Sequence, residues 1–555
     1  MTIKLISLLV LAVIFAWRGS VLVQKWRARR AGKSPSAMDE PITIIHSGKD
    51  PSWHAPLFDA AANAPFFLKP WLQAGDAPTF AKEEEGETLE IIWHTTDDSK
   101  AWHVEVSPVA AEGQAGSTDF VAVDVDDPAP LAPLIPLPPD VNRPVFLPKR
   151  RKIELVGVVS QVQYIARLTG LKPGEPFVYT VFADGIPVYH ATARARPALG
   201  KPFKAMLFGD MGNGSKWQRA IAYQMSLEQK RGAELIISTG DVVYQNGRYS
   251  EYLSKFFAVY QPSKNDPDTG ATLFDDTVVL SCGGNHDVGW LDPQTLVTFD
   301  EYPDMMAYYQ LWSMPLNGPD ATALGANKPP LRGRESSVKA MLDAADGRYP
   351  RMSNYSYDYG VAHFLVLDAN VYMDWTDAKL RHWVEADLKA VAAGQWKIVV
   401  FHHPPFTSNI NHQSEQRMRF LADIFERCGV DVVFNGHAHL YDRSHPLKFA
   451  VDGGITPAAM DFAGYVSGKF VYDTKFDGVT QTKPDGVLYI VTGGGGAKLD
   501  SKILQDNPSL WQRSTAKLLG DRHSFTVADF SPTALQLTQI DYEGKVVDSF
   551  VITKI

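Results

Sequence analysis

The run Glu234-Leu-Ile-Ile-Ser-Thr-Gly-Asp-Val-Val-Tyr244 decides the fold, because a short apolar stretch leads directly into a glycine and then into side chains that can bind a metal ion. An unbroken run of branched apolar residues is typical of a strand that is buried on both faces of a sheet. We therefore expect Asp241 and Tyr244 at the carboxyl end of that strand. In open α/β sheets, this is the edge where loops converge to form a site.

Four further apolar runs in the chain end in residues of the same kind. Carboxylate, amide and imidazole side chains can all serve as metal ligands, and they follow each run within a few residues. Because the carboxyl ends of parallel strands meet at one edge, the five groups are expected to share one crevice. The runs cover residues 203–208, 277–281, 396–401 and 430–434, and they lead to Asp210, to Asn285, His286 and Asp287, to His402, and to His437 and His439.

The chain is long enough for two or more domains, since 555 residues exceed what one hydrophobic core usually fills. Residues 77–200 contain several short runs of alternating apolar and polar side chains, which predict an N-terminal β-sandwich. In residues 201–555, strand-like runs alternate with helical periodicity, for example at 217–231, 376–392 and 415–428. This order predicts a second domain in which two sheets lie between helices, a four-layer αββα arrangement. The expected fold class therefore combines α+β and α/β architecture.

Composition excludes some functional classes. With 45% hydrophobic and 21% charged residues the chain is typical of globular proteins, and a formal net charge of −9 offers no general basic surface for nucleic acid. Cys282 and Cys428 lie in apolar contexts, so we expect two buried thiols rather than a disulfide.

Residues 1–31 are expected to form a hydrophobic anchor or a signal-like segment. Leu5 to Trp17 is an unbroken apolar run that is short for a spanning helix, and basic residues follow it. We favour membrane association or secretion through this segment, on either side of the membrane, over a disordered or buried amphipathic tail. Residues 32–76 are expected to be a linker. Residues 290–352, which contain aromatic and Pro/Gly-rich stretches, are expected to form a loop insertion over the mouth of the site.

Two metal ions about 3.5–4 Å apart can neutralise a phosphate ester, activate water and stabilise the leaving oxygen. Asp241 suits a bridging position between them, because both oxygens of its short side chain can be used. A phenolate among the ligands of one ion selects iron(III), whereas neutral amide and imidazole ligands suit a divalent ion such as zinc, iron(II) or manganese(II). The expected ligands are Asp210, Tyr244 and His439 for the first ion, and Asn285, His402 and His437 for the second.

Taken together, the five segments resemble the motifs of the purple acid phosphatases, a branch of the calcineurin-like metallophosphoesterases. The resemblance covers the chain from about residue 80 to its carboxyl end. It includes the predicted β-sandwich, because the plant-type members also have an N-terminal fibronectin type III-like domain. All seven expected metal ligands are present. The matching motifs are Gly209-Asp210-Met211-Gly212, Gly240-Asp241-Val242-Val243-Tyr244, Gly284-Asn285-His286-Asp287, Val399-Val400-Phe401-His402 and Gly436-His437-Ala438-His439.

The resemblance also implies roles for residues outside the ligand set. It implies that His286 faces the phosphate or the leaving oxygen, and that Asp287 fixes the tautomer of His286. His412 falls near the position of a phosphate-contacting histidine of plant members, although Asn411 replaces a second histidine often found there. The attacking group that the family implies is a metal-bound hydroxide.

Several of these residues also have a simpler interpretation. An aspartate after glycine can be a helix N-cap, and Tyr244 by itself can be a packing residue, but five ordered motifs favour ligands. His403 is expected to support the site or to lie in the core, and His363 is expected to be a core histidine. Gly493 to Gly496 are expected to form a turn or a close backbone approach, because the chain has no Gly-x-x-x-x-Gly-Lys-Ser/Thr pattern that would indicate a phosphate cradle.

Three functions are compatible with these residues. We expect hydrolysis of small-molecule phosphomonoesters at mildly acidic pH, that is, an acid phosphatase without a nucleic-acid partner. The alternative is hydrolysis of phosphodiesters or nucleotide pyrophosphates on the same scaffold. A third is a membrane-tethered, non-catalytic binding protein, which the complete set of ligands disfavours.

Overall fold

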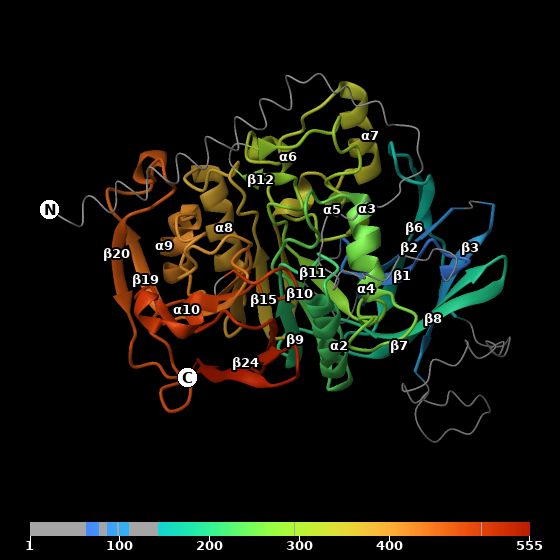
Figure 1. The fold of residues 1–555 in the computed structure, drawn as a ribbon. Helices are drawn as coiled ribbons and strands as arrows, with labels where there is room; N and C mark the ends of the chain where they lie inside the picture. The colour runs from blue at the N-terminus through green and yellow to red at the C-terminus, as the bar shows by residue number, and fades with distance from the viewer. Residues whose placement is uncertain are drawn as a thin grey trace. The chain divides into compact units, whose positions relative to one another are not determined.

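The computed structural model describes residues 63–76, 86–96, 99–109, 143–292, 295–500 and 502–554 (Figure 1). The predicted anchor at residues 1–31 lies outside these ranges, as do residues 32–62 of the predicted linker. Within the described ranges, no helix is both long and apolar enough to cross a membrane.

Two antiparallel four-stranded sheets form the N-terminal part of the described chain, which confirms the predicted β-sandwich. The indole rings of Trp93 and Trp102, which come from opposite sheets, lie 5.7 Å apart in the core that the sheets share. The first sheet has the order β1 (Leu68–Gln73), β2 (Glu87–Thr95), β6 (Gln161–Leu171) and β5 (Lys149–Ile153), and the second has the order β4 (Val145–Phe146), β3 (Trp102–Pro108), β7 (Pro176–Ala183) and β8 (Ile186–Arg194).

Two mixed sheets form the rest of the chain, together with two small hairpins. One sheet has six strands and the other has seven. The six-stranded sheet has the order β11 (Val278–Ser281), β10 (Ala233–Ser238), β9 (Phe203–Phe208), β23 (Ser524–Phe530), β24 (Ala534–Asp541) and β25 (Val546–Thr553). The seven-stranded sheet has the order β14 (Tyr355–Tyr359), β15 (Ala362–Val366), β16 (Trp396–Val400), β17 (Val432–Asn435), β21 (Leu488–Thr492), β18 (Tyr441–Ser444) and β22 (Thr515–Leu519). The hairpins pair β12 (Trp290–Asp292) with β13 (Thr295–Leu296), and β19 (Leu447–Val451) with β20 (Gly468–Tyr472).

The two longest helices begin at residues whose side chains cap them. The Ser215 side chain accepts a hydrogen bond from the Gln218 N–H at the start of α2, and Asp377 caps α8 in the same way. The predicted helical stretches 217–231 and 376–392 form α2 and α8, and the stretch 415–428 contains η4 and α9. The helices are α2 (Lys216–Lys230), α3 (Tyr249–Glu251), η2 (Tyr252–Phe257), α4 (Ala258–Tyr260), α5 (Tyr308–Leu311), α6 (Ala321–Leu324), α7 (Glu335–Ala345), η3 (Arg351–Ser353), α8 (Ala378–Ala390), η4 (Arg417–Leu421), α9 (Ala422–Arg427), η5 (Pro457–Ala459), α10 (Lys502–Asp506) and η6 (Pro508–Leu510).

The two large sheets pack face to face, with helices on their outer faces. The ring of Phe364 in β15 lies 6.2 Å from that of Phe203 in β9 and 6.0 Å from that of Phe530 in β23, so aromatic side chains from both sheets fill the space between them. Helices α8 and α9 share a second apolar cluster with the outer face of the seven-stranded sheet, and α2 contacts β10 of the other sheet. The αββα prediction is therefore confirmed.

Parallel pairing brings the ends of the predicted ligand-bearing strands together. Strand β10 pairs in parallel with both β9 and β11, and Ile236 lies opposite Met206 and Val279. In the other sheet, β16 pairs in parallel with β17. All five predicted segments thus leave their sheets at carboxyl ends, which is the placement that the sequence indicated.

Two predicted segments differ from expectation. Residues 68–73 of the predicted linker form β1, which is a buried edge strand of the sandwich, because their apolar side chains pair with β2. The predicted loop over the site mouth at residues 290–352 contains α5, α6 and α7. Its buried residues pack toward the sandwich, since Ser313 Oγ donates to Glu90 Oε2 at 2.6 Å and the Gln310 carbonyl accepts from Gln163 Nε2 at 2.9 Å.

Candidate metal centre

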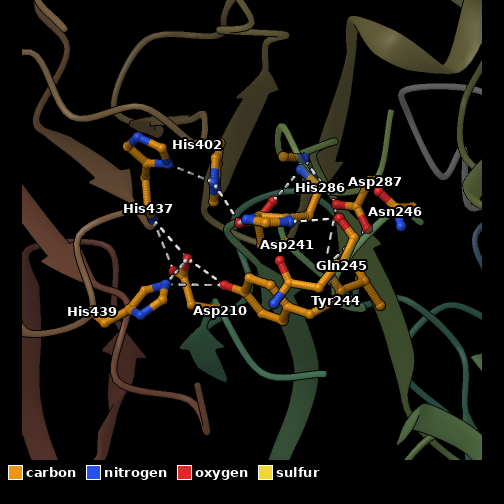
Figure 2. A network of polar contacts seen from close by, with 12 residues as sticks. Asp210, Asp241, Tyr244, Gln245, Asn246, His286, Asp287, His402, His437 and His439 are labelled. Carbon is orange, nitrogen blue, oxygen red and sulfur yellow. Dashed lines mark hydrogen bonds and ion pairs between the residues drawn. The ribbon is translucent and has the colours of Figure 1, made fainter. Parts of the chain in front are cut away.

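Three of the predicted ligands adopt a backbone conformation that L-residues rarely use. Asp210, Asp241 and His437 have φ angles of 57°, 52° and 68°, and they make up half of the six non-glycine residues with positive φ in the described chain. This left-handed conformation is strained for a side chain larger than glycine and is characteristic of functional turns. The turns hold these three side chains toward one another (Figure 2).

Donor atoms of Asp210, Tyr244 and His439 converge on one point. The Tyr244 hydroxyl lies 3.0 Å from Asp210 Oδ1 and 3.1 Å from His439 Nε2, and the Asp210 and His439 atoms are 3.4 Å apart. Ligands that bind one ion tetrahedrally at about 2.1 Å lie roughly 3.4 Å from each other. Burial, followed by the carboxylates of Asp210 and Asp241, raises the pKa of Tyr244 well above its usual value, so a cation is needed before this hydroxyl can ionise.

A second group of donors contains Asp241, His402, His437 and Asn285. His402 Nε2 lies 3.2 Å from Asp241 Oδ2 and 3.2 Å from His437 Nδ1. These three side chains are buried and could hold a metal ion. The Oδ1 atom of Asn285 is also buried and has no hydrogen-bond partner in the described chain, which is costly unless a cation satisfies it.

Backbone carbonyls fix which nitrogen of each imidazole faces the centre. The Nδ1 atoms of His402 and His439 lie 2.8 Å from the Thr239 carbonyl and 2.7 Å from the Lys498 carbonyl. A carbonyl can only accept, so each Nδ1 carries a proton and each Nε2 is left to bind a cation. His402 Nε2 faces His437 Nδ1 at 3.2 Å, and a cation bound by these nitrogens would take the place of the protons on them.

The electrostatics of Asp241 agree with a position between the two groups. Burial opposes ionisation, but the imidazoles of His402 and His286 hold the pKa of Asp241 well below its usual range. Burial also opposes protonation of His402, yet the Asp241 carboxylate raises the pKa of His402 to about 10. Asp241 is thus an anion at neutral pH, as a bridging ligand must be.

His286 lies at the edge of this centre but is not oriented by Asp287. Its Nε2 atom is 3.9 Å from Asp241 Oδ2, and its Nδ1 atom is 2.7 Å from the Gln245 carbonyl. Asp287 instead accepts hydrogen bonds from the Val242 and Gly284 N–H groups at 3.0 and 2.9 Å. The prediction that Asp287 fixes the tautomer of His286 is therefore corrected: the Gln245 carbonyl does so, and Asp287 ties the Asp241 loop to the Asn285 loop (Figure 2).

His412 lies over His437, and its predicted contact with phosphate stays a prediction. Their ring centroids are 4.0 Å apart, and the His412 side chain is 21% exposed. Two carboxylates flank it, with Glu415 Oε1 3.3 Å from Nδ1 and Asp500 Oδ2 3.6 Å from Nε2. Burial lowers the pKa of His412, but these carboxylates outweigh burial and raise it to about 9.

Glu415 and Asp500 were not identified from the sequence. Glu415 Oε2 lies 2.9 Å from His437 Nε2 and 3.6 Å from His403 Nε2. The spacing of three residues between His412 and Glu415 could have indicated this contact, because such residues share one face of a helical turn. Asp500 carries no comparable signal, since it reaches the centre from a distant loop.

The remaining sequence interpretations can be compared with the structure directly. His403 is buried, and its ring centroid lies 4.2 Å from that of His437, so it supports the site rather than the distant core. His363 is a satisfied core histidine between Asp358 and Asp387. Cys282 and Cys428 are free, buried thiols. A Cβ atom on Gly493 would lie 2.2 Å from the Ala438 carbonyl, which agrees with a close backbone approach.

Comparison with known proteins agrees with this geometry. Residues 203–441 match the family model of the calcineurin-like phosphoesterases. The chain carries a calcineurin-like phosphoesterase domain. That domain spans the segments bearing all seven predicted ligands.

The resemblance of this chain to purple acid phosphatases is also confirmed. It is 22% identical over 532 residues to purple acid phosphatase 13 of Arabidopsis thaliana, an alignment that covers 89% of this chain and 82% of the relative. It is 35% identical over 318 residues to purple acid phosphatase 23 of the same plant, covering 53% and 60% of the two chains. The structure of a purple acid phosphatase from yellow lupin seeds has the same fold, with a TM-score of 0.56, 16% identity, and 88% and 75% of the two chains covered.

Proposed function

We propose that this protein hydrolyses phosphomonoesters at a centre of two metal ions, as an acid phosphatase. The observation that carries the proposal is the pair of donor groups on either side of Asp241, one ending in Tyr244 and the other containing the unpartnered Asn285 Oδ1. His286 and His412, with side chains 18% and 21% exposed, lie beside these buried donors where a substrate could reach them. Two buried cation sites next to accessible imidazoles suit phosphate ester hydrolysis.

The donor chemistry supports different metals at the two sites. Asp210, Tyr244 and His439 offer carboxylate, phenol and imidazole, which suit iron(III), and the amide and imidazoles of the second group suit zinc, iron(II) or manganese(II). Two ions bound there would supply Lewis acidity to the phosphoryl oxygens and lower the pKa of water.

The chain's own residues then have defined tasks in the hydrolysis. An oxygen of water forms a new bond to phosphorus, the ester P–O bond breaks, and a proton passes to the leaving oxygen. His286, held through Nδ1 by the Gln245 carbonyl, keeps Nε2 directed at the centre, where it can contact a phosphoryl or leaving oxygen. His412, flanked by Glu415 and Asp500 and in contact with His437, can donate a hydrogen bond to the phosphoryl group.

The test is hydrolysis of an aryl phosphate monoester and of the matching diester across acid to neutral pH by metal-loaded protein. We expect the monoester to be preferred, with a maximum at mildly acidic pH. His402→Ala removes a ligand and should lower kcat by about a thousandfold or more. His382→Ala, an exposed histidine of α8, is the matched control and should retain activity.

Three other results would each change the conclusion. Preference for the diester would replace the proposal with phosphodiester or nucleotide pyrophosphate hydrolysis on the same centre. Equal activity in His402→Ala would show that hydrolysis does not arise at this centre. Absence of turnover of either ester by protein with bound metal would leave a non-catalytic binding role.

We further propose that residues 1–31 place the protein at a membrane or direct its secretion. The apolar run from Leu5 to Trp17 and the basic residues that follow it support this proposal. Fractionation of cells that express the full chain or a chain lacking residues 1–31 tests it. Equal partition of both chains into the soluble fraction of the cells would contradict it.

A further inference from the structure

A cavity of about 680 Å³ lies beside the segment that carries His412. The hairpin β19–β20, residues 407–416 and the residues that precede β22 form its walls. Its lining includes Gln413, Arg419, Asp452, Tyr472 and Arg513. A cavity of this size is large enough for an organic molecule, and it is separate from the buried donors of the metal centre.

Arg419 places a positive charge in this cavity without a carboxylate beside it. Its Nε donates to the Pro405 carbonyl at 2.9 Å and its Nη1 to the Val466 carbonyl at 3.0 Å, which uses two of its five N–H groups. The guanidinium also lies 4.8 to 5.3 Å from the ring centroids of three phenylalanines. No carboxylate of the described chain forms an ion pair with it, so an anion from outside would be stabilised.

Next to Arg419, the lining of the cavity combines aromatic rings with a second arginine. The rings of Phe470 and Tyr472 are stacked, with centroids 5.4 Å apart, and the Arg513 guanidinium lies 5.9 Å from the Tyr472 centroid. Arg513 is exposed and has no ion-pair partner among the described residues. Stacked rings bind flat molecules, and guanidinium groups bind carboxylates and phosphates. Asp452 also lines the cavity. Near its carboxylate, a ligand should therefore present a neutral hydrogen-bond donor rather than a second anionic group.

The cavity shares a wall with the metal centre. His412 contacts the His437 ring, while its neighbour Gln413 lines the cavity and accepts a hydrogen bond from Gln512 Nε2 at 2.9 Å. The next pair also faces two sides: Glu415 contacts His437 at the metal centre, and Gln416 lines the cavity. Residues 412–416 therefore separate the two, and a leaving group that extends from the centre past this segment would reach the cavity.

We propose that the cavity binds the leaving group of the ester, and that preferred leaving groups carry a flat ring and an anionic group of their own. This inference rests on the proposed phosphatase function and names its substrate class. The anion binds Arg419 and Arg513, and the ring packs on Tyr472. Substrates of this class are aromatic or heterocyclic phosphate esters with an additional carboxylate or phosphate.

The test compares phenyl phosphate with para-carboxyphenyl phosphate, which differ in the charge of the leaving group. We expect wild-type protein to prefer the carboxylated ester in kcat/KM, and Arg513→Gln to reduce that preference by about five- to tenfold. Arg419→Met should also reduce the preference for the carboxylated ester. Because residue 513 is exposed, Arg513→Gln should fold normally and remains informative even if Arg419→Met does not fold. Arg332→Gln, at an exposed arginine that does not line the cavity, is the matched control and should keep the preference.

A binding measurement provides a readout besides turnover. By calorimetry, para-hydroxybenzoate should bind the wild-type metal-loaded protein more tightly than phenol does, and Arg513→Gln should remove the difference. If both esters are hydrolysed and the preference is the same in wild type and Arg513→Gln, the cavity proposal fails while the phosphatase function stands. If neither ester is hydrolysed, the proposed function fails, and the leaving-group role fails with it even where para-hydroxybenzoate binds.

Discussion

Replacing His363 with glutamine should reduce stability in a pH-dependent way. His363 in β15 is enclosed by two carboxylates: its Nδ1 lies 2.9 Å from Asp358 Oδ1, and its Nε2 lies 2.8 Å from Asp387 Oδ2. Asp358 comes from the neighbouring strand β14 and Asp387 from helix α8, so the imidazolium joins the sheet to the helix that covers it. Glutamine retains polar atoms of similar reach but carries no charge.

The size of the effect follows from the pKa of this histidine. Burial disfavours its charge, but the hydrogen bonds to Asp358 and Asp387 raise the pKa of His363 from 6.5 to about 9, and its side chain is only 6% exposed. At 1.36 kcal/mol for each pKa unit, this difference corresponds to about 3 kcal/mol. Because the folded pKa is raised, the stabilisation is fully present below pH 6.5 and is lost as pH rises through about 9.

Thermal unfolding at two pH values measures this contribution. For a domain of roughly 350 residues, about 3 kcal/mol corresponds to a change in Tm of about 4 °C. We expect His363→Gln to lower Tm by this amount near pH 6 and by clearly less near pH 9.5. His382→Gln is the control, because His382 is an exposed histidine of the same helix that bears Asp387. A difference between wild type and His363→Gln that is equal at both pH values would refute the ion-pair reasoning.

Two further substitutions address the contact with the sandwich and the metal centre. Tyr249→Phe removes a hydroxyl that lies 2.5 Å from Gln161 Oε1 and 2.9 Å from His94 Nδ1 of the sandwich. It should lower the free energy of unfolding by about 1–3 kcal/mol, and a Tm equal to that of wild type would contradict this. Asn285→Ala removes the buried, unpartnered Oδ1. Elemental analysis should then find that the metal content falls from two ions per chain toward one. Two tightly bound ions in this variant would exclude Asn285 as a ligand.

The strands and the ligand segments could be predicted because their signals are local. The runs at 203–208 and 396–400 form strands at the expected residues, since continuous apolar stretches bounded by glycine or proline leave few alternatives. Each motif contains its own turn as well as its ligand. Convergence of the motifs then followed from parallel pairing, which places strand ends at one edge.

Other parts of the site depend on contacts that no local pattern encodes. The groups that fix the imidazole tautomers are the backbone carbonyls of Thr239, Gln245 and Lys498, and every residue has a carbonyl whatever its type. Asp500 approaches His412 from far along the chain. Residues 68–73 could not be assigned to the sandwich from sequence because strand pairing with β2 decides their structure.

The glycines before the ligands explain why the motifs have the form they do. A Cβ atom on Gly284 would lie 2.1 Å from Asp241 Oδ1, and one on Gly436 would lie 2.6 Å from Asp210 Oδ2. Both distances are far shorter than a van der Waals contact, so each glycine makes room for the carboxylate of a different loop. The glycine of one motif and the aspartate of another therefore form a single packing unit. It follows that the motifs specify how the loops interlock as well as which atoms can bind metal, and a Cβ atom at either glycine would push a ligand out of the donor group to which it belongs.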